Sequence, residues 1–219
     1  MKILIACEKS GVVRDAFLDQ GHDAWSCDLL PSETPSNRHI QDDVRNVLKY
    51  ESWDLLMVAH PPCTRLCNSG VQWIKRPNGD KTVRDQVEEL VEGSKFFAEM
   101  WNADVPRVAI ENPIMHKYAK KRIERFSERE FPWKATQIVQ PWQFPESEEA
   151  SDNVKKATCF WIRDLPILKA TGKVDGSSAR ADIHNEPPSE NRAENRSRFF
   201  PGMAKAMAEQ WGNHVRTTK

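Results

Sequence analysis

Residues 2–28 of the chain read KILIACEKSGVVRDAFLDQGHDAWSCD, and this stretch decides the fold. The apolar run Lys2–Cys7 predicts a buried strand, and the amphipathic stretch Gly11–Gln20 predicts a helix. Asp23–Cys27 predicts a second strand, which ends at Asp28. Successive strand–helix steps of this kind build a mostly parallel sheet flanked by helices, so we expect an α/β, Rossmann-like fold.

The same alternation continues along the chain. Helices are expected at residues 44–50, 83–100, 116–125 and 203–211, and strands at 54–59, 105–110, 135–140 and 157–162. Residues 64–81 and 175–198 are rich in Gly, Pro, Asn or Ser and predict loops. A chain of 219 residues suits one core, so we expect a single domain over 1–219, with a reduced recognition or loop region at about 141–198.

Composition excludes several classes of protein. Lys plus Arg equals Asp plus Glu at 32 each, so no overall field draws the chain onto nucleic acid or a membrane surface. No apolar run approaches the roughly 20 residues of a membrane helix. Five cysteines without a secretory leader predict reduced thiols in the cytoplasm. Any nucleic-acid contact must therefore come from local patches.

Four predicted strand ends carry polar or reactive residues, and ligands of an open parallel sheet bind beyond such carboxyl ends. Residues 8–11 (Glu8, Ser10 and Gly11 among them) lie between a strand and a helix, where backbone N–H groups can face a cofactor. Asp28 closes the second strand and can accept hydrogen bonds from ribose hydroxyls, although a turn cap is an equal alternative.

The next two strand ends hold a thiol and a carboxyl group. Cys63 follows its strand directly, in a stiff turn behind two prolines, and Glu111 ends the following strand beside Asn112. The alternatives are a buried structural cysteine and a surface salt bridge. Cys63, Cys67 and His60 also raise the question of zinc, but no second ligand pair follows at the required spacing, so we expect no metal.

These motifs resemble, in their order and over nearly the whole chain, those of the cytosine-C5 DNA methyltransferases. His60-Pro61-Pro62-Cys63, with Ser69-Gly70 behind it, resembles the Pro-Cys motif and implies that Cys63 is the nucleophile. Glu111-Asn112 resembles the Glu-Asn motif, whose Glu holds and protonates the pyrimidine ring nitrogen. Asp28 resembles the acid that binds the cofactor ribose, Asp43 the Asp near the adenine, and Gly212-Asn213-His214-Val215 the closing Gly-Asn motif.

The chain departs from the family pattern in three places. The glycine-rich cofactor loop Phe-x-Gly-x-Gly-Gly is reduced to Cys7-Glu8-Lys9-Ser10-Gly11, the large target-recognition region is missing, and the Gln-x-Arg-x-Arg motif has no clear counterpart. With these reductions the chain resembles compact methyltransferase-like proteins found in phage genomes. This resemblance implies that the protein is located in the cytoplasm of a bacterial host. Sequence specificity is then minimal or supplied by a protein partner.

The resemblance implies a DNA cytosine-C5 methyltransferase that uses S-adenosylmethionine on duplex or single-stranded DNA. Its expected residues are, for catalysis, Cys63, Glu111 and Asn112; for the cofactor, Glu8, Ser10, Gly11, Asp28, Asp43, Pro61 and Asn213; and for nucleic acid, Arg65, Ser69, Arg192, Arg196 and Arg198. A nearby cation must lower the pKa of the thiol, and Arg65 is the nearest in sequence.

Three questions stay open from the sequence. Lys117, Lys120, Lys121, Arg122 and Arg125 form a second positive patch on one predicted helix, for which a solvated helix face is an equal explanation. The same cysteine addition also activates a pyrimidine in RNA or in a free nucleotide. The third alternative is a methyltransferase fold without catalysis that serves as a binding or inhibitory protein.

Overall fold

The structure is a computed structural model, and it describes residues 1–76, 79–182, 187 and 198–217. The described residues form one seven-stranded sheet with the order β3-β2-β1-β4-β5-β7-β6. Its strands are β1 (Lys2–Ala6), β2 (Asp23–Asp28), β3 (His39–Gln41), β4 (Leu55–Val58), β5 (Arg107–Asn112), β6 (Gln137–Val139) and β7 (Thr158–Arg163). Neighbours from β3 to β5 pair parallel, and β7 pairs antiparallel with both β5 and β6. The expected α/β class with a mostly parallel sheet is confirmed.

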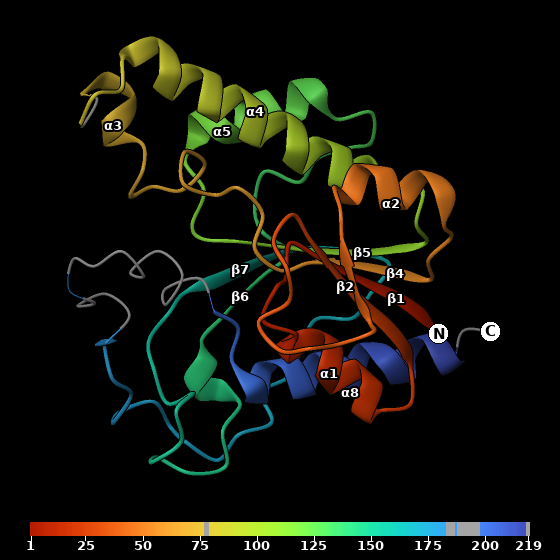
Figure 1. Ribbon diagram of the computed structural model, residues 1–219. Coiled ribbons are helices and arrows are strands. Elements are labelled where there is room, and N and C mark those ends of the chain that lie inside the picture. Colours follow the sequence, from red (N-terminus) through yellow and green to blue (C-terminus); the bar gives the residue numbers. More distant parts are fainter. Residues whose placement is uncertain (77–78, 183–186, 188–197, 218–219) are drawn as a thin grey trace.

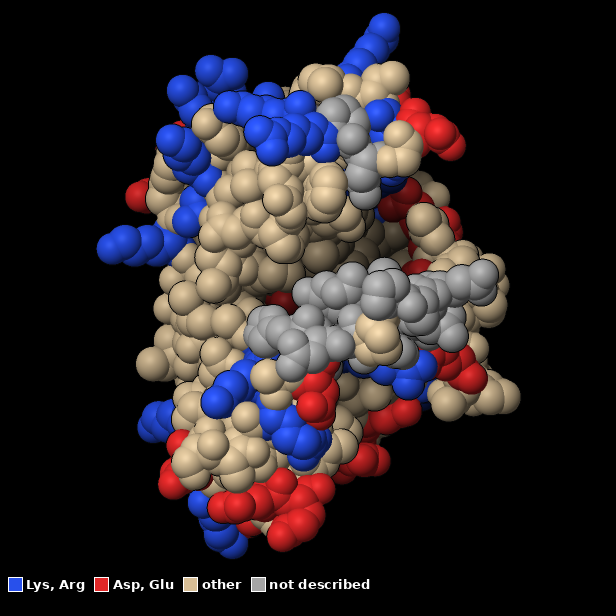
Figure 2. All heavy atoms as spheres, turned by 90° about the vertical axis from the view of Figure 1, so that its left-hand side faces the viewer, with Lys and Arg blue, Asp and Glu red and all other residues tan. Residues whose placement is uncertain are grey.

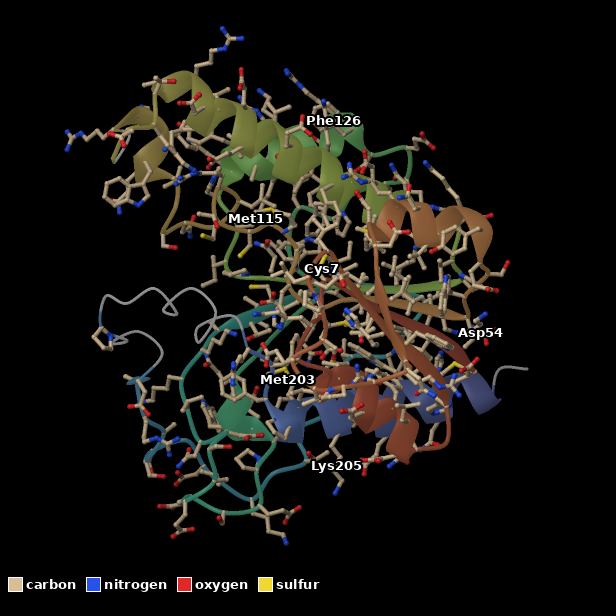
Figure 3. The ribbon with its side chains drawn as sticks, viewed as in Figure 1. Cys7, Asp54, Met115, Phe126, Met203 and Lys205 are labelled. Carbon is tan, nitrogen blue, oxygen red and sulfur yellow. The ribbon has the colours of Figure 1, made fainter. Side chains whose placement is uncertain are left out.

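Helices cover both faces of this sheet (Figure 1). On one face lie α1 (Val12–Asp19) and α8 (Pro201–Thr217), and on the other lie α2 (Val44–Tyr50), α4 (Val83–Asn102) and α5 (Lys117–Phe126), with the short α3 (Gln72–Lys75) beside the start of α4. Each face has its own apolar core. Figure 3 shows one residue of each, Met115 on the side of α4 and Met203 on α8.

The apolar pattern along each strand explains why it is covered twice. In β4, Leu56 and Val58 face one core while Leu55 and Met57 face the other, and all four are fully buried. A parallel strand buried on both faces needs such a continuous apolar run. The described helices include none that is long and apolar enough to cross a membrane.

The order of the strands in the sheet determines where a ligand site is expected. In the order 3-2-1-4-5 of a doubly wound sheet, the connections change direction between β1 and β4, and a crevice opens there beyond the carboxyl ends. The N–H of Ala59 donates to the carbonyl of Ala6 at 2.9 Å. Hydrogen bonds between β1 and β4 therefore continue up to the edge of the crevice. The residues that follow, Cys7 after β1 and His60 after β4, therefore border the crevice.

The strand expected at 157–162 is β7, within the region 141–198, and it pairs with both of its neighbours. Two other expectations need correction. The last helix begins at Pro201 and continues to Thr217, beyond the predicted 203–211. Residues 39–41 form β3 and residues 72–75 form α3, which were not predicted because both elements are short and polar.

Candidate active site

Cys63 lies in a turn that the rest of the site holds firmly. Its carbonyl accepts hydrogen bonds from the N–H groups of Leu66 (2.9 Å) and Cys67 (3.1 Å), which closes one helical turn behind the two prolines. Gly70 packs so tightly below this turn that a Cβ there would lie 1.8 Å from the carbonyl oxygen of Thr64. The half-buried thiol is thus carried by a well-defined backbone.

The loop of Cys63 is tied to the segment after β5. His116 begins α5 by accepting the N–H of Ala119 at Nδ1, and its Nε2 lies 2.7 Å from the carbonyl oxygen of Arg65. The N–H of His116 donates to the carbonyl of Leu66 at 3.0 Å. This buried histidine therefore fixes the start of α5 against the loop that carries the thiol.

Glu111 and Asn112 are the last two residues of β5, next to β4 in the sheet. Glu111 is 6% exposed, and within the described chain no hydrogen bond reaches its carboxyl group. Asn112 is fully buried; its amide donates to the carbonyl of Pro113 at 2.6 Å, while Oδ1 has no partner among the described residues. Buried polar groups are usually paired, so these two side chains are suited to meet a ligand.

Burial and mutual repulsion set the protonation of the thiol and the carboxyl group. Burial raises the pKa of Glu111 to about 7 from an ordinary 4.5, against the opposing effect of Lys156. Burial, followed by the charge of Glu111, raises the pKa of Cys63 to about 12, again opposed by Lys156. Cys63 and Glu111 are thus close enough that the ionisation of one disfavours the ionisation of the other.

The cation of this site is Lys156, and not Arg65. Arg65 is buried and its guanidinium donates to Glu89 of α4 at 2.7 Å, so it is a structural ion pair. Lys156 precedes β7; its Nζ donates to the carbonyl of Arg198 at 3.3 Å and lies 5.5 Å from the ring centre of Phe200. No sequence pattern points to Lys156, because it lies 45 residues beyond Glu111 in a loop.

His60 completes the wall of the crevice. Its ring centre lies 5.4 Å from that of Phe199, and burial, aided by Lys156, lowers its pKa to about 3. His60 is therefore neutral at physiological pH. Figure 2 views this end of the molecule and shows a hollow between the two helix layers, with acidic atoms at its floor.

Glu8 does not face a cofactor. Its carboxylate is fully buried and accepts hydrogen bonds from the N–H groups of Val13 (2.7 Å) and Arg14 (3.2 Å), so it caps the N-terminus of α1 from inside. The hydroxyl of Ser10 donates to the same carboxylate at 3.4 Å. Gly11 begins α1 with φ 79°, and a Cβ there would lie 2.2 Å from the guanidinium of Arg14. Glu8, Ser10 and Gly11, which were predicted to bind the cofactor, instead stabilise the conformation of this loop and the start of α1.

The other predicted cofactor residues divide between the two edges of the sheet. Asp28 ends β2 at the carboxyl edge, where its Oδ1 accepts the N–H of Leu30 at 2.9 Å, and the buried Pro61 lies in the crevice behind β4. Asp43 caps α2 and pairs with Arg45, which lowers the pKa of its carboxyl group.

Asn213 lies at the opposite edge, so its assignment to the cofactor is wrong. It is exposed near the end of α8, where a Cβ on Gly212 would lie 2.3 Å from His22, the residue just before β2. Its other neighbour, His214, lines a surface groove with Arg107, the first residue of β5. All of these contacts are at the amino ends of the strands.

The predicted nucleic-acid residues are dispersed. Ser69 is exposed, with its hydroxyl 3.1 Å from the sulfur of Cys67, and Arg198 is exposed and pairs with Glu33 at 3.4 Å. Arg65 is buried in the ion pair described above. Arg192 and Arg196 lie outside the described residues.

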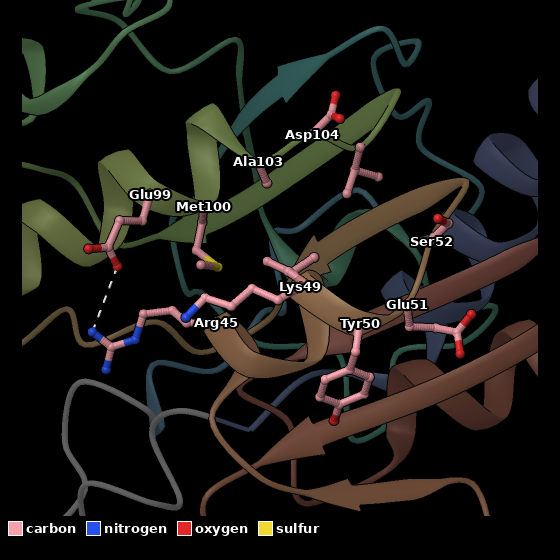
Figure 4. Close-up of a pocket in the computed structure, with 11 residues that line it drawn as sticks. Arg45, Lys49, Tyr50, Glu51, Ser52, Glu99, Met100, Ala103 and Asp104 are labelled. Atoms are coloured by element: carbon pink, nitrogen blue, oxygen red, sulfur yellow. Dashed lines mark ion pairs between the residues drawn. The ribbon is translucent and has the colours of Figure 1, made fainter.

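A groove of about 550 Å³ opens elsewhere, between α2 and the end of α4 (Figure 4). Its lining includes Arg45, Tyr50, Glu99 and Asp104. These residues precede β4 and β5, so the groove lies at the amino edge, away from Cys63. Among the described residues no cluster of three or more His, Cys, Asp or Glu side chains is arranged to hold a metal ion.

Comparison with known proteins adds no family assignment. The chain matches no protein-family model, and no curated protein has a significantly similar sequence.

Proposed function

We propose that the protein is an S-adenosylmethionine-dependent DNA cytosine-C5 methyltransferase in which Cys63 is the nucleophile. The observation that supports this most is the pairing of the half-buried Cys63 with the buried Glu111 at the carboxyl ends of adjacent strands β4 and β5. The reaction needs a thiolate to attack the ring and an acid to protonate it, and the site offers a thiol beside a carboxyl group that can take up and return a proton near neutral pH.

The protonation equilibria of Glu111 and Cys63 suit this chemistry. With a pKa of about 7, Glu111 is close to half ionised at neutral pH and can both accept and donate a proton. A net shift of the thiol proton to an ionised Glu111 produces a thiolate and a carboxylic acid without changing the total charge of the site. Lys156 stabilises that single negative charge in either position.

The reaction then proceeds in balanced steps. Cys63 Sγ bonds to C6 of cytosine while Glu111 gives its proton to the ring nitrogen, and the electron pair moves to C5. The methyl donor, when bound, would supply an electrophilic methyl group on a sulfonium, whose sulfur would leave as a neutral thioether. Loss of the C5 proton to a base and cleavage of the S–C6 bond return the Cys63 thiolate, and the ring nitrogen returns its proton to Glu111.

The described residues fit the adenosine half of this cofactor better than its amino-acid half. Asp28 stands at the end of β2, where a carboxylate can bind ribose hydroxyls. Leu29 and Leu30, which follow it, are 69% and 54% exposed and offer apolar surface there. The N-terminus of α1, in contrast, is occupied by Glu8 and is closed to an anionic group.

That closed helix end favours one second candidate, a protein of this fold that binds a partner without catalysis. The same experiment distinguishes the two. Purified protein is incubated with radiolabelled S-adenosylmethionine and with duplex DNA, single-stranded DNA, RNA or free dCMP, and the transferred methyl groups are counted.

Transfer to DNA is expected for the wild-type protein and is lost in Cys63→Ala. Cys67→Ala is the matched control, because this thiol lies in the same turn and is buried; it retains transfer. Glu111→Gln lowers the rate by about 10²- to 10⁴-fold. No transfer to any substrate, with no cofactor bound in calorimetry, would support the non-catalytic protein.

A further inference from the structure

Helix α5 concentrates positive charge in a chain whose net charge is zero. Its ten residues include one acid, Glu124, and the following five cations: Lys117, Lys120, Lys121, Arg122 and Arg125. Lys117, Lys121 and Arg125 are all exposed and follow one another at intervals of four residues. We call these three residues the basic row; on a helix they lie along one side, over about 12 Å.

Within α5, Lys117 Nζ lies 5.3 Å from the ring centre of Tyr118, and the guanidinium of Arg122 donates to the carbonyl of Tyr118 at 3.4 Å. In the described part of the chain none of the five has a carboxylate within 4.0 Å, although ion pairs engage Arg65, Arg45 and several other cations. Glu124 accepts the indole N–H of Trp133 at 2.6 Å. Like charges four residues apart destabilise a helix, and cations in its first turn oppose its dipole. The charge of α5 is therefore not neutralised by ion pairs among the described residues, and it suits an anionic partner.

The basic row begins beside the candidate active site. His116 ties the start of α5 to the loop of Cys63 through the carbonyl of Arg65. Ile114, between β5 and this helix, is 47% exposed, and Tyr118, in the first turn of the helix, is 44% exposed. In Figure 2 Lys and Arg atoms gather on the upper layer, which contains α5, and uncharged surface lies between them and the hollow.

We infer that the basic row of α5 binds the phosphodiester backbone of a single-stranded nucleic acid and leads one of its bases toward Cys63. Cations along a row match successive phosphates, and an exposed aromatic and an apolar side chain beside them match unstacked bases, a combination typical of single-strand binding. The inference deepens the proposed function, and its statement about the base rests on that function. The surface itself does not depend on catalysis.

The test measures binding alone. Fluorescence anisotropy is followed for a fluorescein-labelled 16-nucleotide DNA strand, and for an RNA strand of the same sequence, over a series of salt concentrations and without cofactor. The test variant carries Lys117→Gln, Lys121→Gln and Arg125→Gln. The matched control carries Lys49→Gln, Lys95→Gln and Lys205→Gln, three exposed lysines on other helices that remove the same charge; Figure 3 shows Lys205 pointing away from the sheet on α8.

The basic-row variant is expected to bind at least tenfold more weakly at about 0.1 M salt, with the slope of log affinity against log salt reduced by about 2, as three lost phosphate contacts on a single strand require. The control keeps the wild-type slope. The two strands distinguish DNA from RNA as the source of the backbone. Equal losses in both variants, or unchanged binding in the basic-row variant, would overturn the inference, and the second result would assign α5 to an acidic protein instead.

Failure of this inference and failure of the proposed function are distinguishable. Circular dichroism melting is expected to show that both triple variants are folded, since all six positions are exposed. If the wild-type protein binds the strand through the basic row but transfers no methyl group, the surface stands and the catalytic proposal falls. The opposite result is transfer of methyl groups to free dCMP by the wild-type protein and by both triple variants, with strand binding unchanged by the basic-row substitutions. In that case the catalytic proposal stands and the proposed binding surface falls.

Discussion

Replacing Glu111 by Gln removes a carboxyl group whose pKa burial raises to about 7 from an ordinary 4.5. A raised pKa means that the folded protein binds this proton more tightly than the unfolded chain does. Its contribution to stability is therefore fully present below pH 4.5 and is lost as pH rises to about 7. The full difference corresponds to about 3 kcal/mol in the free energy of unfolding. Because Gln does not titrate, the variant lacks this loss.

The assay is urea unfolding at pH 5 and at pH 8, followed by the fluorescence of the buried Trp161 and Trp211. Between these pH values the wild-type protein is expected to lose about 2 to 3 kcal/mol more stability than Glu111→Gln does. Glu8, with a pKa also near 7, titrates in both proteins and cancels in the comparison.

Glu89 provides the control, because its pKa is shifted in the opposite direction to that of Glu111. The pKa of Glu89 is lowered by Lys81 and Arg65, so its contribution to stability is present at neutral pH and is lost as pH falls. Glu89→Gln is therefore expected to cost stability at pH 8 and less of it in acid. If the difference between Glu111→Gln and the wild-type protein is the same at both pH values, the burial of an uncompensated carboxyl group is not what sets the pKa of Glu111.

Three further perturbations test the site. Lys156→Met removes the cation that opposes the raised pKa of Glu111, so the pH at which Glu111 ionises is expected to rise above about 7, as the pH dependence of unfolding would show. Gly70→Ala forces a Cβ against the carbonyl of Thr64 and is expected to cost about 1–3 kcal/mol of stability and to lower methyl transfer; a variant as stable as wild type would show that the loop has room. Asp28→Asn is expected to weaken cofactor binding by about tenfold or more in calorimetry, without loss of stability.

The position of Cys63 and Glu111 at one edge of the sheet could be predicted from the sequence, because it follows from a general rule of parallel sheets. Periodic apolar runs identify β4 and β5, and the carboxyl ends of neighbouring parallel strands meet at one edge. Residues directly after or at the end of such strands, Cys63 and Glu111, are therefore placed by local sequence alone. The helix at 44–50 was likewise predicted at its observed bounds, since Asp43 caps it.

The failures come from contacts between residues far apart in the chain. Asn213 was assigned by motif, yet the stretch from Pro201 to Asn213 is one helix and extends about 18 Å, which carries it to the other edge of the sheet. Lys156 enters the site because β7 inserts antiparallel beside β5. Glu8 turns inward because its carboxylate satisfies helix N–H groups within its own loop, a role that the motif pattern does not express.

The buried pair also explains why one lysine is sufficient. Two anions side by side in a site withdrawn from water would each raise the pKa of the other, as the effect of Glu111 on Cys63 shows. The state needed for attack, an ionised thiol beside a protonated carboxyl group, contains one negative charge, and Lys156 balances one. Protonation of Glu111 thus lowers the pKa of Cys63 as it creates the acid that the ring requires. In the proposed reaction the nucleophile and the acid are therefore activated by the same proton shift.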